Sequence, residues 1–470
     1  MIFASFEFLF LFLPLFTAVY FATPDRFRNW PILILSWAFY AWWRVDFLAL
    51  LAGVTLFTFV LAAWMDRHGP RTPAATRLLW VALVGNLGVL AYFKYANFGV
   101  ETFNQVITAA GFTPMSWTNI VLPVGLSFYV LQSVSYAIDV WRGDIRPTKR
   151  FVDYAAYKAL FSQLIAGPIV RYAEIAEMLR HRTHSLAQFG AGARRFMVGF
   201  AMKVLIADTL SPVVDAAFAL PEPTLADAWL GAVAYTLQLF FDFAGYSAMA
   251  IGLALLYGFR FPENFNHPYL ARSIQEFWQR WHMTLSRFLR DYLYIPLGGN
   301  RLGPVRTYVN LMLTMVIGGF WHGANWTFIL WGFWHGLCLS LHRAWNQAGF
   351  RMAAWIALPL TLVVAILGWV PFRAHDLASA FVMLGGMAGL HGVALSDALA
   401  LQVAPDQWWC LWIAVGLVFL PLGNRWWPWA RPEPSGLWRV AVDLAPLAGF
   451  ALSLVALYSR AAAPFLYFQF

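Results

Sequence analysis

Two apolar runs joined by a short turn decide the fold of this chain, and over residues 308–341 they read YVNLMLTMVIGGFWHGANWTFILWGFWHGLCLSL. The runs are Tyr308–Phe320 and Trp326–Leu341, and between Val316 and Phe333 the one ionisable side chain is His322. About 17–25 apolar residues cross a bilayer, and somewhat fewer suffice when polar residues flank them. The stretch therefore predicts two transmembrane helices with a histidine at their junction.

The composition extends this interpretation to the whole chain. Of its 470 residues, 61% are hydrophobic and only 12% are charged, whereas soluble domains carry about 25% charged residues. So few charges cannot cover a water-exposed surface, and we expect the lipid bilayer to be the main solvent. The formal charge of +9 comes largely from arginines in short loops, which is typical of topology signals and anionic-lipid contacts and not of nucleic-acid binding.

Further apolar runs predict an all-α polytopic membrane protein with about eleven or twelve spans around a central cavity. We treat residues 1–470 as a single membrane domain, in which segments 141–195 and 260–306 are cytoplasmic or re-entrant. The other candidate spans are Ile2–Phe21, Trp30–Trp43, Phe47–Trp64, Leu78–Phe93, Ile120–Val140, Phe196–Leu220, Trp229–Phe259, Ala353–Phe372, Trp408–Leu422 and Val440–Tyr458.

The loops between the spans alternate in positive charge. Arginines are concentrated at residues 26–28, 67–77 and 142–150, whereas the loop over residues 101–119 has no basic residue. Basic loops stay in the cytoplasm, so we predict a periplasmic N-terminus and cytoplasmic segments 66–77 and 142–150. Arg425, Arg431 and Arg439 predict another inner loop, and twelve spans would also place the C-terminus outside.

The segment 260–306 carries seven arginines against three acidic residues, interleaved with aromatic residues. It is either a basic amphipathic helix at the cytoplasmic face or a re-entrant, protein-buried helix beside a cavity. His282, Ser286 and Arg290 are spaced i, i+4, i+8 and would share one helix face. Such a face could hold an anionic cofactor through Arg280, Arg287 and Arg290, although a simple solvated face has the same pattern.

Three polar side chains inside apolar runs are candidates for chemistry or for structural pairing. His322 lies among glycines, where a histidine is costly without a purpose, and its ordinary pKa suits a base. His335, in the second Trp-His-Gly motif, is predicted to be structural. Asp242 needs a partner such as Lys203 or an arginine of segment 260–306. The two cysteines, Cys338 and Cys410, are too few for a Cys-rich zinc site, and we expect no metal.

Several stretches together resemble the membrane-bound O-acyltransferase (MBOAT) superfamily, in its bacterial alginate O-acetyltransferase branch. The resemblance covers nearly the whole chain and rests on the order of these motifs: Tyr40-Ala-Trp-Trp-Arg, Leu122-Pro-Val-Gly-Leu-Ser-Phe128, Ala166-Gly-Pro-Ile-Val-Arg171, Phe241-Asp-Phe-Ala-Gly-Tyr-Ser247, Glu263-Asn-Phe-Asn266, Trp281-His-Met-Thr-Leu-Ser286, Trp321-His-Gly323 and Tyr467-Phe-Gln-Phe470. The branch usually has an acidic residue after Tyr-Ser, where this chain has Ala248.

The resemblance implies roles for individual residues. It places the essential acyl-transfer histidine at His322 and the second family histidine at His282. Under this reading, His322 is the general base, and the Asn325 amide is a candidate donor to the oxyanion.

The resemblance also implies an inner-membrane enzyme with no bound cofactor, which takes acetyl from cytoplasmic acetyl-CoA to a periplasmic acceptor for exopolysaccharide O-acetylation. Periplasmic acetyltransferase-like proteins and a polysaccharide biosynthesis complex would be its partners. Two alternatives stay open. One is D-alanyl transfer to a teichoic acid-type polymer, and the other is a flippase or transporter of an acyl donor, which the absence of an internal repeat disfavours.

Overall fold

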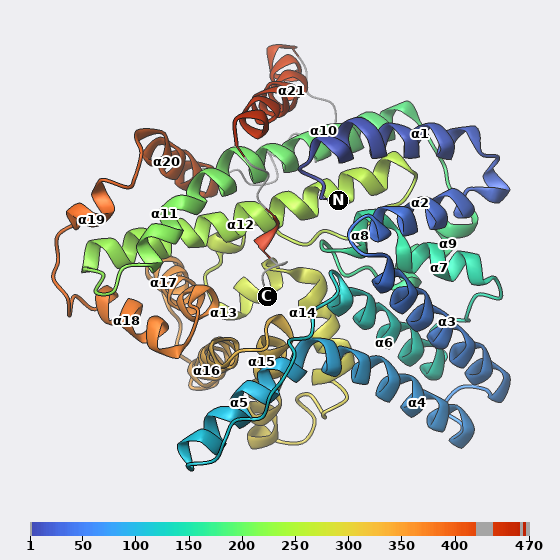
Figure 1. Cartoon of the computed structure of the whole chain (residues 1–470), viewed down its shortest axis with the longest axis horizontal. Coiled ribbons are helices and arrows are strands. Elements are labelled where there is room, and N and C mark those ends of the chain that lie inside the picture. Colours follow the sequence, from blue (N-terminus) through green and yellow to red (C-terminus); the bar gives the residue numbers. More distant parts are fainter. Residues whose placement is uncertain (1, 420–435, 461–463, 467–470) are drawn as a thin grey trace. The chain divides into compact units, whose positions relative to one another are not determined.

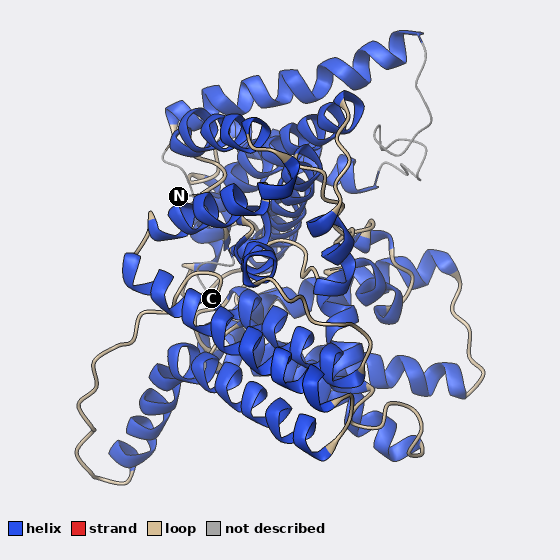
Figure 2. Ribbon diagram, turned by 90° about the vertical axis from the view of Figure 1, so that its right-hand side faces the viewer, coloured by secondary structure: helices blue, strands red, loops and turns tan. Residues whose placement is uncertain are grey.

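The computed structural model describes residues 2–419, 436–460 and 464–466 of the chain. Over these residues the regular elements are helices, and Figure 2 shows helices joined by loops with no strand among the parts described. This confirms the predicted all-α class. The predicted inner loop at Arg425 and Arg431, the Arg439 side chain and the motif ending at Phe470 lie outside the described residues.

The chain divides into two compact units. Unit 1 consists of Met1–Gln188 and Ala254–Pro262, and unit 2 consists of Phe189–Leu253 and Glu263–Phe470. The prediction of one membrane domain over residues 1–470 stays a prediction. Both Trp-His-Gly motifs and all the candidate site residues belong to unit 2.

Unit 1 is built around α3, α4 and α6, which pack against one another and lie side by side in Figure 1. Helix α6 begins only at Leu126, because Pro123 and the left-handed Gly125 precede it. The helices of this unit are η1 Phe8–Phe12, α1 Leu13–Ala22, η2 Asp25–Phe27, α2 Asn29–Ala41, α3 Val45–His68, α4 Pro73–Leu90, η3 Ala91–Tyr95, α5 Ala96–Ala109, α6 Leu126–Arg142, α7 Phe151–Ala159, α8 Phe161–Leu164 and α9 Tyr172–Arg180.

Two loops predicted to be cytoplasmic contact each other in unit 1. The Arg71 backbone N–H donates to the Trp141 carbonyl at 3.0 Å. The Trp141 indole N–H donates to the Thr76 hydroxyl at 3.0 Å. The end of α6 that leads into segment 142–150 therefore lies beside segment 66–77, and the cytoplasmic location of both segments stays a prediction.

Unit 2 contains the hairpin that opened the sequence analysis, α15 followed by α16, and α17 packs beside it (Figure 1). The Trp334 indole donates to the Val364 carbonyl and ties α16 to α17. The helices of this unit are α10 Leu186–Ala201, η4 Met202–Ala207, α11 Asp208–Phe218, α12 Leu225–Leu256, η5 Pro268–Leu270, α13 Ile274–Arg280, α14 Met283–Leu289, η6 Arg290–Tyr294, α15 Pro304–His322, α16 Trp326–Gln347, α17 Ala354–Arg373, α18 Leu377–Met387, α19 Asp397–Ala400, α20 Pro405–Phe419 and α21 Gly436–Ser459.

Helices long and apolar enough to cross a membrane confirm the polytopic membrane class. Five stretches of the described chain meet both criteria: Val45–His68, Pro73–Ala109, Leu186–Phe218, Leu225–Leu256 and Ala354–Arg373. The other predicted spans also fall largely on helices, but several of these helices are short, such as the apolar Phe8–Ala22. The total of eleven or twelve spans stays a prediction.

Candidate active site

His322 is the last residue of α15, and Gly323 ends the helix. The α15–α16 hairpin is unusually close at this point because both helices present glycines. A Cβ atom on Gly319 would lie 2.3 Å from the Phe328 carbonyl oxygen, and one on Gly332 would lie 2.4 Å from the Met315 carbonyl oxygen. The glycines before His322 thus permit close helix packing, as predicted, whereas the helix breaks only after the histidine.

Aromatic rings enclose the His322 imidazole, which is 5% exposed. The Trp331 and Phe372 rings meet it edge-on, with centroids 5.1 and 5.3 Å from its own. These rings belong to the apolar core of unit 2, which also contains Trp281 and Trp369. Little water can surround His322, and electrostatic interactions with it are strong in such a medium.

His282 lies at a break between two short helices. Helix α13 ends at Arg280, α14 begins at Met283, and His282 between them has left-handed backbone angles of φ 41° and ψ 54°. Residues other than glycine seldom adopt this conformation, which costs about 1–2 kcal/mol, and such strain is often found at functional sites.

This break makes His282 the N-cap of α14. Its carbonyl accepts the Ser286 backbone N–H at 3.0 Å, and the Arg290 backbone N–H bonds to the Ser286 carbonyl. The helix predicted through His282, Ser286 and Arg290 therefore begins at His282 itself, and its role as a cofactor-binding face stays a prediction. Phe277 and Trp281 are buried to 1–2% exposure. The apolar side of this part of the segment is therefore buried against protein, and the choice between the two alternatives stays open.

One asparagine holds His282 and fixes its tautomer. The Asn264 side-chain oxygen accepts hydrogen bonds from the Thr284 backbone N–H at 3.3 Å and from the Thr284 hydroxyl at 2.9 Å. A backbone N–H can only donate, so the atom facing it is the amide oxygen. The His282 Nδ1, 3.1 Å from the same oxygen, must then carry a proton. The neutral ring therefore presents Nε2 as its basic atom.

The two family histidines lie close together, with ring centroids 6.4 Å apart. Burial lowers the pKa of His282 to about 3. At neutral pH its ring is therefore uncharged, and Nε2 is a hydrogen-bond acceptor. Sequence spacing of 40 residues gave no reason to bring these two side chains together, and only the family resemblance paired them.

Asp242 is paired with Lys203, which is one of the two partners predicted for it. Its carboxylate lies 2.8 Å from the Lys203 ammonium group, which also contacts the Asp208 carboxylate at 2.5 Å. The second oxygen of Asp242 accepts from the Leu466 backbone N–H at 3.0 Å. Asp242 is 1% exposed, so this network satisfies a buried charge and anchors residues 464–466.

The anchored segment also supports His282. Phe465 stacks on Tyr246 with centroids 4.5 Å apart and contacts Phe243 at 5.6 Å. Phe243 in turn meets the His282 ring edge-on at 4.7 Å. Asp242 is therefore linked to His282 through the packing of Phe465 and Phe243, and its structural role stays a prediction.

The arginines proposed to bind an anionic cofactor do not share a common partner in the structure. Arg280 pairs with Glu276 at 2.7 Å, and the exposed Arg290 pairs with Asp291 at 2.7 Å. Arg287 is half-buried on α14. Their role toward a cofactor stays a prediction.

Asn325 is the N-cap of α16. Its amide oxygen accepts from the Thr327 backbone N–H at 3.1 Å, and its amide nitrogen donates to the His375 carbonyl at 2.8 Å. The side chain thus already caps a helix end. The oxyanion role assigned to it stays a prediction.

Sequence reasoning missed Asn264 and the aromatic enclosure formed by Trp331 and Phe372. The motif Glu263-Asn-Phe-Asn266 contributed to the family resemblance without any role for its first asparagine. Two asparagines within three residues of a largely apolar chain were an available signal. The aromatic residues carried none, because their spacing is that of any buried helix.

A cavity of about 320 Å³ reaches Asn264 and Met283, the neighbours of His282, and Ala248 also lines it. Its lining includes the ion-paired Arg195 and Glu263. In the part of the chain that the structure describes, no cluster of three or more His, Cys, Asp or Glu side chains could hold a metal ion. Two buried histidines close together, one of them next to residues that line a cavity, are suited to proton transfer on a substrate.

Comparison with known proteins agrees with this class. The model of the membrane-bound O-acyltransferase family matches residues 145–370. The probable alginate O-acetylase of Azotobacter vinelandii is 47% identical over 100% of both chains. That of Pseudomonas aeruginosa is 53% identical over 82% of this chain and 75% of its own length. The peptidoglycan O-acetyltransferase of Helicobacter pylori is 38% identical over 83% of this chain and 80% of its own.

The chain belongs to the membrane-bound O-acyltransferase family. It is a multi-span membrane O-acyltransferase, and within the family it groups with the branch to which these alginate O-acetylases belong. The transporter alternative is therefore set aside.

Proposed function

We propose that this enzyme moves acetyl from cytoplasmic acetyl-CoA to a periplasmic acceptor, for O-acetylation of an alginate-type exopolysaccharide. The observation that carries the proposal is the enclosed pair of His322 and His282, whose ring centroids are 6.4 Å apart. The names of the similar proteins support the acetyl group and the polymer. The proposed location is the bacterial inner membrane, where one protein can reach both the cytoplasm and the periplasm.

In the proposed reaction, His322 takes the proton of the acceptor hydroxyl as the oxygen attacks the thioester carbonyl. The carbon–sulfur bond then breaks, and the leaving thiolate receives the proton back from His322. A positioned base of this kind typically contributes about 10²–10⁴-fold. The C-terminal end of α15 supports the role, because the partial negative charge of a helix C-terminus stabilises a protonated imidazole there.

His282 has a positioning role in this proposal. Its Nδ1 proton is committed to Asn264, so Nε2 is the atom that can accept a hydrogen bond from a substrate group or an ordered water. The cavity of about 320 Å³ at Asn264 supports approach of the donor to this histidine. Ala248 in its wall adds space where the branch usually has an acidic side chain.

The acceptor is either a hydroxyl of a periplasmic acetyltransferase-like partner, which relays acetyl to the polymer, or the polymer itself. The Helicobacter pylori peptidoglycan O-acetyltransferase favours a second candidate acceptor, a peptidoglycan hydroxyl. The same histidine pair would serve either acceptor, so the two are separated by the product and not by the site.

The experiment uses membrane vesicles of both orientations, supplied with acetyl-CoA labelled in its acetyl group. We expect transfer of label only when acetyl-CoA reaches the cytoplasmic face, and none with a His322→Gln variant. Label that appears equally from either face would contradict the sidedness. Transfer of D-alanyl groups from an activated donor, with none of acetyl, would replace the acetyl proposal by the D-alanyl alternative.

The orientation itself is tested by cysteine labelling. In a chain whose Cys338 and Cys410 are replaced by Ser, a His68→Cys variant should resist an impermeant thiol reagent added to intact cells. A matched Thr113→Cys variant, in the basic-free loop, should react. The reverse result would invert the proposed topology.

A further inference from the structure

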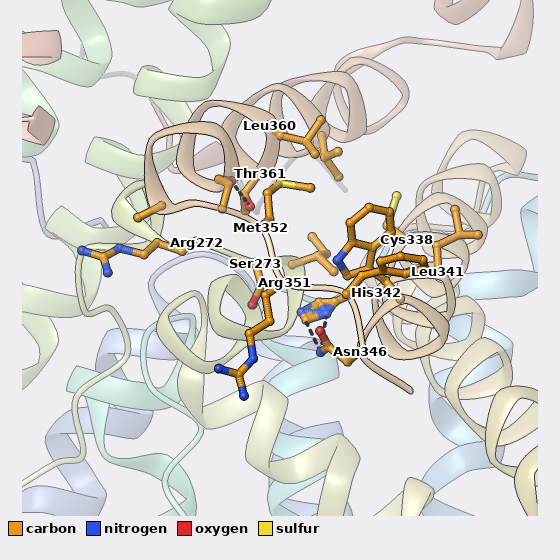
Figure 3. A pocket seen from close by; sticks show the side chains of 16 residues that line it. Arg272, Ser273, Cys338, Leu341, His342, Asn346, Arg351, Met352, Leu360 and Thr361 are labelled. Atoms are coloured by element: carbon orange, nitrogen blue, oxygen red, sulfur yellow. Dashed lines mark hydrogen bonds between the residues drawn. The ribbon is translucent and has the colours of Figure 1, made fainter. Parts of the chain in front are cut away.

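A second and larger cavity lies in unit 2, outside the histidine site. Its volume is about 570 Å³, and it is formed by the end of α16, the start of α17 and residues 272–274 before α13. Figure 3 shows its side chains. In this view Arg272 lies at the left and Arg351 toward the bottom, with guanidinium groups that point in different directions, whereas Leu360 lies at the top and Leu341 and Cys338 lie at the right. The cavity is therefore amphipathic, with polar and apolar walls.

The polar side of the cavity carries positive charge that no nearby carboxylate among the described residues balances. Arg272 and Arg351 are exposed, and neither has a carboxylate partner among the residues that the structure describes. Glu276, close to Arg272 in sequence, is engaged by the Arg280 guanidinium and by the Arg272 backbone N–H, both at 2.7 Å. The chain has no Asp or Glu between Asp291 and Asp376. Two unpaired guanidinium groups in such surroundings favour an anion, and phosphate above all.

The apolar side opens to the outer surface of the helices. Leu341 is 61% exposed and Leu360 is 47% exposed. On the neighbouring turn of α17, Trp355 is 78% exposed. In a membrane protein an apolar surface of this kind faces lipid tails, and aromatic residues such as Trp345 are typical of the interface.

The cavity floor is linked to the His335 region by helix periodicity. Ile274, Cys338 and Val364 line the cavity. One helical turn away on the same three helices are Trp278, His335 and Gly368. A ligand in the cavity would brace these helices against one another.

We propose that this cavity binds one anionic phospholipid from the surrounding bilayer. Arg272 and Arg351 attract the anionic head group through their positive charge, and an acyl chain lies along the apolar walls of α16 and α17. An anionic head with an apolar tail matches both walls, whereas a soluble anion would leave the apolar wall without a partner. The site is independent of the acetyl-transfer proposal.

Cys338 provides the test, because it lines the cavity and Cys410 is the other cysteine in the sequence. In a Cys410→Ser background, N-ethylmaleimide would be reacted with Cys338 in bilayers of phosphatidylcholine, with and without phosphatidylglycerol. We expect phosphatidylglycerol to slow the reaction. Its half-effective content should rise about fivefold for each of Arg272→Gln and Arg351→Gln, since one arginine near a membrane contributes about 1 kcal/mol to anionic-lipid attraction.

The matched control is Arg301→Gln, which removes an exposed arginine outside the cavity and should leave the slowing unchanged. Equal rates of Cys338 modification with and without phosphatidylglycerol would overturn the proposal. Slowing by phosphatidylglycerol that survives in the Arg272→Gln/Arg351→Gln double variant would also overturn it. Slowing by coenzyme A or inorganic phosphate in phosphatidylcholine would show a site for a soluble anion instead. If the double variant does not accumulate, the two single variants decide the matter through their fivefold shifts.

Discussion

The chain contains the same three residues twice, and the two copies lie in different environments. Trp321-His322-Gly323 ends a helix, whereas Trp334-His335-Gly336 lies in the middle of α16. His322 has a second histidine within 6.4 Å. His335 is wholly buried, its ring meets Trp331 at 4.9 Å and Trp278 at 5.2 Å, and neither ring nitrogen has a hydrogen-bond partner among the described residues.

The same motif therefore places its histidine in two different surroundings, according to its position in the helix. At the end of α15 the chain leaves the helix directly after His322, whose ring lies beside that of His282. In the middle of α16 the ring is packed on several sides, and a Cβ atom on Gly368 would lie 2.7 Å from the His335 Nε2. The structural role of His335 stays a prediction, and among the described residues aromatic rings surround its imidazole.

The largest expected effect separates the two copies directly. His322→Gln should reduce acetylation at least about 10²-fold, because glutamine can hydrogen-bond but cannot act as a base. His335→Gln, the matched control, should keep most of its activity. The measurement is the acetyl content of secreted polysaccharide, normalised to the amount of variant protein in membranes. Equal losses in both variants would erase the distinction between the copies.

A smaller loss is expected when His282 loses its orienting partner. Asn264→Ala removes the acceptor for the His282 Nδ1 proton and should lower kcat about tenfold, in line with the effect of removing groups that orient a functional histidine. Asn264→Asp keeps that acceptor and should recover part of the activity. A purely structural Asn264 would instead lower protein abundance in both variants, with normal activity per molecule.

Asp242 should affect stability more than activity. Asp242→Asn removes one of the two carboxylates that compensate the buried Lys203 and leaves Asp208 as its partner. Breaking a buried ion pair costs up to about 3–5 kcal/mol. We expect a lower thermal transition of the purified protein with only a few-fold change in activity per folded molecule. Complete loss of activity in a normally stable Asp242→Asn protein would mean that the carboxylate takes part in the chemistry.

The smallest effect is expected at Arg290. Its pair with Asp291 is exposed, and such pairs contribute about 0–1 kcal/mol, so Arg290→Ala should leave abundance unchanged. If the side chain assists donor binding, the apparent KM for the acyl donor should rise a few-fold with kcat intact. A variant that only becomes less abundant would contradict the cofactor hypothesis for this segment.

The apolar runs made the helical membrane fold predictable, because length and composition determine what a bilayer accepts. A cationic partner for Asp242 could be predicted, since a buried carboxylate demands a cation, and Lys203 was one of the two options named. The break at His282 could not be foreseen. No glycine or proline marks it, and the left-handed backbone is stabilised by Asn264, which contacts it only in the folded chain. The Phe465–Phe243 support was hidden for the same reason, because the contact is distant in sequence.

The hydrogen bond from Leu466 to Asp242 joins residues 224 positions apart. Contacts so distant in sequence form late in folding. While the chain is still being synthesised, the Asp242 carboxylate on α12 lacks its hydrogen bond from Leu466 until residue 466 has left the ribosome. Until then Phe243 lacks the ring that backs it. Fusions or cleavage near residue 466 should therefore impair assembly of the histidine site even though they lie far from it along the chain.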